Sequence, residues 1–88
     1  MTTEKPKLYA LSSCLHCEDT AILLDECEVE YDYIEVDYLK GEERKAVLAH
    51  VKEINPRCSF PTIIINGRVI VGYQEDEIRA ALRPTNEG

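Results

Sequence analysis

The chain has 88 residues, of which 44% are hydrophobic and 31% are charged, and its formal net charge is -7. This size and composition predict a single folded domain over residues 1–88, with a core over about 7–83 and a loose tail over 84–88. The acidic excess repels nucleic acid and anionic membrane surfaces, so we expect neither as a partner. No apolar run reaches the roughly 18 residues of a membrane span, and we expect a cytoplasmic monomer.

The first half of the chain predicts a strand, a helix and a second strand. Residues Lys7 to Leu11 form a short apolar run that ends at two serines, as is typical of a buried strand followed by a turn. From Leu15 to about Glu26, apolar residues recur at helical spacing and acidic residues are available for a solvated face. Residues 31–36 are rich in β-branched and aromatic side chains, which predicts the second strand.

The second half begins with a predicted helix and a predicted β-hairpin. The helix starts near Gly41 and must end before Pro56, because proline lacks the N–H that a helix interior needs. Strands over residues 62–65 and 69–71 flank Asn66-Gly67. This dipeptide is the one best suited to a two-residue hairpin turn, since both central positions need positive φ.

A final helix is predicted over about residues 75–82, where acidic side chains in the first turn suit the helix dipole. The order of elements is therefore βαβ, helix, β-hairpin, helix. A βαβ unit aligns two strands in parallel, and a hairpin adds two antiparallel strands. The sequence thus predicts an α/β fold with a four-stranded mixed sheet and helices on both faces.

Two of the four cysteines form the motif Cys14-Leu15-His16-Cys17 between the first strand and the first helix. A helix N-terminus offers unpaired N–H groups and partial positive charge, which stabilise a thiolate. We therefore expect Cys14 to be the attacking thiol. Cys17 follows about one helical turn later, so it can attack the same sulfur and resolve a mixed disulfide. It should be less exposed and less acidic than Cys14.

Metal binding is an alternative interpretation of this motif, because zinc sites use the same spacing. The other residues that could act as ligands form no second closely spaced pair: Cys27, Cys58, His16 and His50. We therefore favour redox chemistry, and expect no metal ligands and no tightly bound cofactor. Two other hypotheses stay open, a zinc or iron–sulfur module and a non-catalytic adaptor.

His16 lies inside the motif and is a candidate for tuning the reactivity of Cys14. A protonated imidazole near the sulfur would favour the thiolate and make the disulfide more oxidising. The alternative is a histidine that faces solvent and has no electrostatic role. Titration of the Cys14 thiolate in a His16→Ala variant would separate these two interpretations.

Three motifs, in this order along the chain, resemble those of glutaredoxins, a family of the thioredoxin superfamily. They are the strand–CxxC–helix start, Ser59-Phe60-Pro61-Thr62 before the hairpin, and Gly72-Tyr73-Gln74-Glu75-Asp76 before the last helix. The resemblance extends from about Lys7 to Leu82. It implies a thioredoxin-like fold and a dithiol electron carrier that reduces protein or glutathione mixed disulfides.

The resemblance also implies where a substrate binds. Pro61 would follow a cis peptide bond and face the CxxC motif, so that the backbone of Phe60 pairs with an extended substrate. Further substrate contacts are implied at the start of the last helix, from Gly72, Tyr73, Gln74, Glu75 and Asp76.

The reductant is open between two candidates. The resemblance to glutaredoxins implies glutathione as a co-substrate. The pattern over residues 72–76, however, is a glycine followed by an aromatic residue, two further residues and an acid. This pattern is similar to that of the ribonucleotide-reductase redoxins, which draw electrons from thioredoxin reductase. We therefore expect disulfide-containing proteins as partners, with either glutathione or a flavoprotein reductase as the source of electrons.

Overall fold

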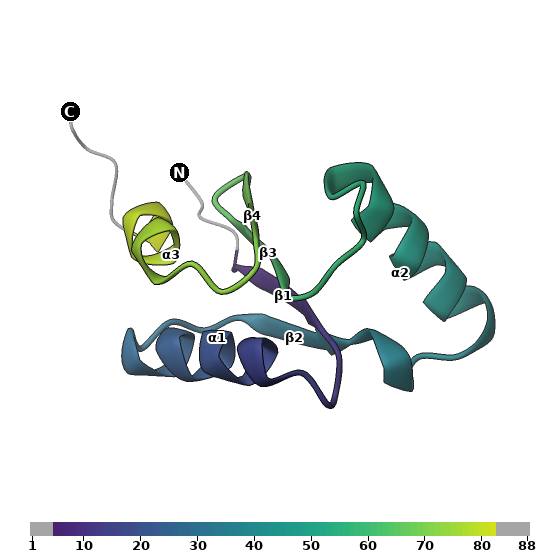
Figure 1. The fold of residues 1–88 in the computed structure, drawn as a ribbon, viewed down its shortest axis with the longest axis horizontal. Helices are drawn as coiled ribbons and strands as arrows, with labels where there is room; N and C mark the ends of the chain where they lie inside the picture. Colours follow the sequence, from purple (N-terminus) through teal and green to yellow (C-terminus); the bar gives the residue numbers. More distant parts are fainter. Residues whose placement is uncertain (1–4, 83–88) are drawn as a thin grey trace.

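The computed structural model describes residues 5–82 and contains the predicted elements in the predicted order (Figure 1). The predicted elements are β1 (Lys7–Ala10), α1 (Leu15–Glu26), β2 (Asp32–Glu35), α2 (Gly41–Ile54), β3 (Thr62–Ile65), β4 (Arg68–Val71) and α3 (Glu75–Leu82). A short 3-10 helix, η1 (Val36–Tyr38), lies between β2 and α2 in addition. The loose tail expected over residues 84–88 lies outside the described residues.

The four strands form one mixed sheet, as predicted, and their order within it is β2-β1-β3-β4. β1 and β2 run parallel, whereas β3 is antiparallel to both β1 and β4. The register pairs Ala10 with Glu35, Tyr9 with Thr62, and Thr62 with Val71. β1, β2 and β4 therefore end at the same end of the sheet at which β3 begins. The connecting segments that adjoin this end are residues 11–14, 36–38, 60–61 and 72–74.

The predicted hairpin turn lies at the opposite end of the sheet. Asn66 and Gly67, which join β3 to β4, have φ values of 51° and 80°. Glycine adopts this left-handed conformation without a steric penalty, and asparagine tolerates it better than most residues. The local sequence therefore accounts for the turn.

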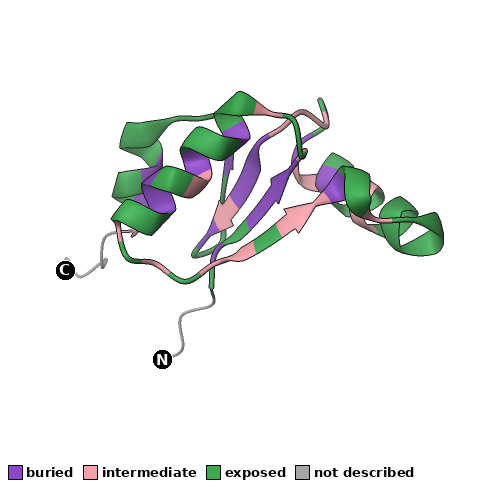
Figure 2. Ribbon diagram, turned by 90° about the horizontal axis from the view of Figure 1, so that it is seen from below, coloured by how far each residue is buried: buried purple, intermediate pink, exposed green. Residues whose placement is uncertain are grey.

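Alternating side chains of the strands pack against helices on both faces of the sheet, as predicted (Figures 1 and 2). On one face, Ile63 belongs to a buried cluster with Leu24 of α1 and Ile78 of α3. On the other face, Tyr9 packs in a cluster with Val51 of α2. The cysteine motif therefore opens a helix that is anchored in the larger of these two clusters.

The chain departs from the prediction after β2, where η1 replaces the last residue of the predicted strand. Val36 begins η1 and is buried in the cluster with Tyr9. β1 ends at Ala10, which pairs with Glu35, so no neighbouring strand residue is left for Val36. The strand β1 is shorter than predicted because the carbonyl of Leu11 accepts a hydrogen bond from the N–H of Cys14 at 3.3 Å, which closes a turn.

Candidate active site

Cys14 caps the N-terminus of α1, where the sequence predicted it. Its backbone is extended, with φ -106° and ψ 116°, and its Sγ accepts a hydrogen bond from the backbone N–H of Cys17 at 3.2 Å. The side chain is half-buried. The first turn of a helix has N–H groups without helical partners, so negative charge on a sulfur is favourable at this position.

Cys17 is fully buried and is therefore less exposed than Cys14, as predicted. Burial, followed by the hydrogen bond with Cys14, raises the pKa of the Cys17 thiol to about 12. Cys17 is thus protonated at neutral pH, and both cysteines are free thiols in this structure. The motif combines one half-buried sulfur at a helix end with one buried sulfur that keeps its proton.

The two residues between the cysteines point outward. Leu15 is 76% exposed, and His16 is also exposed. The backbone carbonyl of His16 accepts a hydrogen bond from the hydroxyl of Thr20 at 2.8 Å, as in a regular first helical turn. The proposed effect of His16 on Cys14 stays a prediction.

Ser12 and Asp37 fix the loop that carries Cys14, a role that the sequence analysis missed. The backbone N–H of Ser12 donates to Asp37 Oδ1 at 3.0 Å, and its hydroxyl donates to Oδ2. The hydrogen bond from this hydroxyl lowers the pKa of the Asp37 carboxyl. These bonds connect η1 to the residues just before Cys14. No sequence signal could have paired two residues that lie 25 positions apart.

The peptide bond between Phe60 and Pro61 is cis, as the resemblance implied. Pro61 is buried, and its carbonyl accepts a hydrogen bond from the N–H of Gly72 at 2.8 Å. Thr62, the next residue, pairs with Tyr9 of β1. Pro61 therefore lies beside the end of β1, from which the chain continues into the loop that carries Cys14.

Asn55 organises the segment that leads into Pro61, and no motif in the sequence marks it for this role. It is 3% exposed, and its Nδ2 donates to the carbonyl and hydroxyl of Ser59 and to Thr62 Oγ1, at 3.0 to 3.3 Å. Its Oδ1 accepts a hydrogen bond from the N–H of Arg57 at 3.2 Å. Thr62 in turn donates to the Ser59 carbonyl at 2.7 Å. One buried amide thus holds both ends of this loop.

Removing this amide is expected to destabilise the fold. Asn55→Ala leaves buried acceptors without their donor, which costs about 1–3 kcal/mol of unfolding free energy. Urea unfolding measures this loss. Asn55→Asp is the matched variant, because it keeps the shape but replaces the donor with an acceptor. A stability of Asn55→Asp equal to that of the wild type would contradict the assigned role.

The resemblance implied substrate contacts from five residues, 72–76. These residues lie at the end of the sheet where β4 ends and α3 begins. Gly72 has φ 84°, and Tyr73 is 37% exposed. Gln74 donates from its side chain to the Val71 carbonyl at 2.9 Å and accepts the N–H of Ile78 on its own carbonyl. The carboxylate of Glu75 is bound by Arg79 Nε at 2.9 Å, and Asp76 is exposed. The side chains of Gln74 and Glu75 are therefore already hydrogen-bonded to other groups of this chain.

A cavity of about 480 Å³ lies between the loop before Pro61 and the start of α3. It is lined by Asn55, Pro56, Arg57, Val71 and Gln74. Arg57 is exposed there, and a guanidinium can hold a carboxylate through two parallel hydrogen bonds. The cavity adjoins the loop that leads into Phe60 and Pro61.

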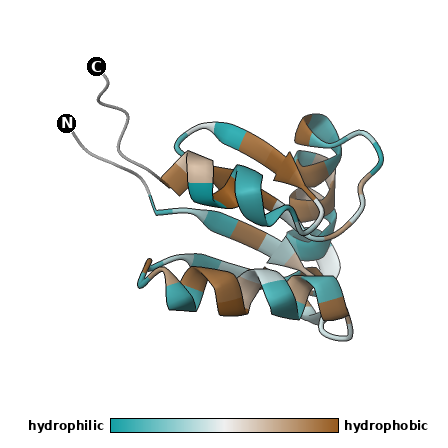
Figure 3. Cartoon of the chain, turned by 60° about the vertical axis from the view of Figure 1, so that its left-hand side comes forward, coloured by the Kyte–Doolittle hydropathy of each residue, from teal (hydrophilic) through white to brown (hydrophobic). Residues whose placement is uncertain are grey.

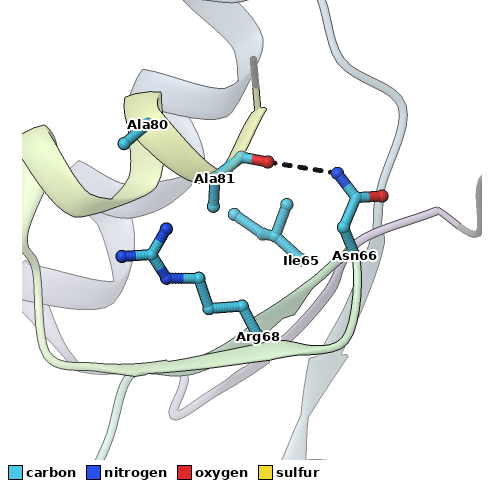
Figure 4. A pocket seen from close by; sticks show the side chains of 5 residues that line it. All are labelled: Ile65, Asn66, Arg68, Ala80 and Ala81. Atoms are coloured by element: carbon cyan, nitrogen blue, oxygen red, sulfur yellow. Dashed lines mark hydrogen bonds between the residues drawn. The ribbon is translucent and has the colours of Figure 1, made fainter. Parts of the chain in front are cut away.

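A smaller cavity, of about 230 Å³, lies at the opposite end of the sheet beside the hairpin turn (Figure 4). The side chain of Asn66 donates to the carbonyl of Ala81 at its rim, and Arg68 pairs with Glu77 at 2.7 Å. The length of the sheet separates this cavity from the cysteines, so we do not include it in the candidate active site.

Two further properties concern residues 5–82. None of the helices in this range combines the length and the apolar character needed to cross a membrane. Over the same described range, no three or more His, Cys, Asp or Glu side chains gather in a way that could hold a metal ion.

Comparison with known proteins identifies the family. The family model for glutaredoxin matches residues 7–70. The crystal structure of a glutaredoxin from Methanosarcina mazei is similar, with 44% sequence identity and a TM-score of 0.83 over 89% of this chain and 77% of that one. Methanoredoxin from Methanosarcina acetivorans has 37% identity and a TM-score of 0.84, over 93% of this chain and 95% of that one.

A curated relative is longer than this chain. A probable maleylacetoacetate isomerase of Caenorhabditis elegans is 42% identical over 72 residues, which is 80% of this chain but 31% of the relative. The chain thus spans about a third of that protein's length. The glutaredoxin model, in contrast, covers most of the present chain and includes both residues of the CxxC motif. The chain therefore belongs to the glutaredoxin family, whose members generally act as thiol–disulfide oxidoreductases.

Proposed function

We propose that this protein is a dithiol electron carrier that reduces protein or glutathione mixed disulfides through Cys14 and Cys17. The observation that carries the proposal is the contact at the start of α1. Cys14 Sγ accepts the N–H of Cys17 at 3.2 Å, and Cys17 is fully buried in the cluster against which Cys14 packs. One sulfur can therefore attack an incoming disulfide, while the second stays protonated within reach of the first.

The proposed reaction has two exchange steps. The Cys14 thiolate attacks one sulfur of the substrate disulfide, forms a mixed disulfide and releases the other substrate sulfur as a thiolate. Cys17 then loses its proton and attacks the Cys14 sulfur, which releases the second substrate thiolate and leaves a Cys14–Cys17 disulfide. The substrate gains two electrons, the protein loses two, and the released thiolates take up protons. No bound cofactor is needed.

The substrate is proposed to lie along the backbone of Phe60 and against Pro61. Gly72, Tyr73, Gln74, Glu75 and Asp76 would line its other side. Two observations support this placement: the hydrogen bond from Gly72 to Pro61, and the adjacent cavity that Arg57 and Gln74 line. An extended substrate can pair with exposed backbone groups in this arrangement, as in other cases of strand addition.

The oxidised protein needs a reductant, and we propose glutathione or a flavoprotein of the thioredoxin-reductase type. We expect NADPH consumption with a model disulfide when the protein is coupled to at least one of two systems, glutathione plus glutathione reductase, or thioredoxin reductase. The Cys14→Ser variant is the control, and it should consume NADPH at the rate of the blank.

Each result of this assay has a distinct meaning. Activity with glutathione alone would assign glutathione as the co-substrate, and activity with thioredoxin reductase alone would assign the flavoprotein. Inactivity with both systems, in a protein that is folded and reduced, would contradict the proposed function. A non-catalytic adaptor or a metal-binding module would then account better for the motif.

A further inference from the structure

The helix that follows Cys14 has an exposed face with no partner among the described residues. Leu15, Glu18, Asp19 and Ile22 are spaced three, four and seven positions apart and lie on one side of α1. All four are exposed, and the two apolar ones are 76% and 53% exposed. We call these four residues the α1 face. It begins next to the attacking sulfur and extends for about 10 Å along the helix.

Two exposed tyrosines lie beside the α1 face. Tyr33, on the edge strand β2, is 43% exposed, and Tyr73, before α3, is 37% exposed. Burial raises the pKa of Tyr33, and Glu35 and Glu18 are among the nearby charges that raise it further. Partial desolvation also raises the pKa of Tyr73, and the nearby Glu75 and Asp19 raise it further. Aromatic residues at such positions are common contact residues in protein interfaces.

The charge on this side of the molecule is strongly negative. α1 carries four acidic residues and no lysine or arginine. α3 carries three acidic residues and Arg79, which is already bound to Glu75. α2, on the other side of the sheet, balances Arg44, Lys45 and Lys52 against three glutamates. The negative charge therefore gathers on the helices that lie on the same face of the sheet as Cys14. Figure 3 shows hydrophobic and hydrophilic residues interspersed along α1.

We infer that the α1 face is a docking surface for a polypeptide substrate whose residues next to the disulfide are basic and apolar. Basic side chains would meet Glu18 and Asp19, and apolar ones would cover Leu15 and Ile22. This inference rests on the proposed function, because it names the substrate class of the same two cysteines. Opposite charges at such a surface raise the rate of encounter and select among partners.

Other occupants fit this surface less well. A second copy of the chain would bring the same negative charges into contact, which is unfavourable. A glutathione disulfide is small and anionic at neutral pH, so it would not reach along the helix to Ile22 and would be repelled by Glu18 and Asp19. A basic segment of a protein substrate has the opposite charge to the α1 face and is long enough to extend along it.

The test compares short peptides that each hold one disulfide and the same apolar residues but differ in their flanking charges. Fully reduced protein is mixed with the lysine-flanked or the glutamate-flanked peptide, and its oxidation is followed in a single turnover without added reductant. We expect the lysine-flanked peptide to react about tenfold faster at low ionic strength. This preference should fall to less than about twofold at roughly 0.5 M salt, because salt screens exposed charges.

A pair of matched variants locates the effect. Glu18→Gln/Asp19→Asn removes two charges from the α1 face, and Glu42→Gln/Glu43→Gln removes two from α2. Only the first variant should lose most of the preference. An equal loss in both variants would indicate a general effect of net charge and would overturn the assignment to α1.

Two further outcomes are distinguishable. Equal rates with both peptides in the wild type, or a preference that salt does not change, would overturn the docking surface and leave the redox function intact. No oxidation of the protein by any peptide would overturn the proposed function, and the docking surface with it.

Discussion

Replacing Cys14 with serine is expected to reduce disulfide reduction to the rate of the uncatalysed exchange, whereas Cys17→Ser should stop the reaction after its first step. A hydroxyl at position 14 cannot replace a thiolate as the attacking group. Without Cys17, the mixed disulfide between Cys14 and the substrate has no internal thiol to resolve it. The first variant should therefore remain reduced, and the second should accumulate a covalent adduct.

Mass spectrometry of the intact protein after exposure to a peptide disulfide measures this difference. Cys27 and Cys58 are also free and half-buried, so both should be replaced by serine in every protein compared. A variant with all other cysteines removed and Cys14 retained should gain the mass of one peptide thiol. An adduct on Cys17 in the Cys14→Ser variant, with turnover retained, would contradict the assigned order of attack.

The second large effect concerns the pH dependence of resolution. Burial, above all, raises the pKa of Cys17 to about 12, so only a small fraction of this thiol is ionised at neutral pH. Its attack on the mixed disulfide requires the thiolate. Below the pKa, the thiolate fraction rises about tenfold for each pH unit, and the rate of resolution should rise in parallel from about pH 7 upward. In the mixed disulfide, Cys14 is no longer a free thiol, so its hydrogen bond and its charge no longer raise the pKa of Cys17. Burial, which is the largest cause of the raised pKa, remains.

This rate can be followed directly with a chromophoric leaving group. The mixed disulfide of Cys14 with an aromatic thiol is prepared at acidic pH and then mixed rapidly with buffers of increasing pH. Attack by Cys17 releases the aromatic thiolate, which absorbs visible light, and the Cys17→Ser variant should release none. A rate that is constant between about pH 7 and about pH 9 would show that Cys17 is already ionised at neutral pH, against the expectation from its burial.

The fold could be predicted from the sequence because its strongest local signals agree with one another. Each of three local signals predicts one or more helices or strands: the Asn66-Gly67 turn, the helix break before Pro56 and the apolar strands. Because the connections between these elements are short, few topologies are possible. The position of the cysteine motif at a helix N-terminus could be predicted as well, because the motif lies between a strand and a helix whose sequence patterns are clear. The family resemblance supplied the cis bond before Pro61, which spacing alone does not reveal.

The contacts that hold the site in place could not be predicted in the same way. Asp37 reaches Ser12 across 25 positions, and Asn55 is buried although it is a polar residue. Such contacts depend on how the loops fold over the end of the sheet, and hydrophobic periodicity carries no information about them. β1 ends one residue before its predicted end for a related reason, because a turn closed by Leu11 and Cys14 outweighs the apolar character of Leu11.

The convergence of the strand ends also constrains the kinetics of a full catalytic cycle. The attacking sulfur, the loop at Pro61 and the start of α3 all lie at one end of the sheet, and only Cys14 of the pair is partly accessible. Under the proposed function, the electron donor and the electron acceptor must therefore occupy the same surface in turn. Neither can bind while the other is engaged, so the cycle is of the ping-pong type, and an excess of either partner inhibits the half-reaction of the other.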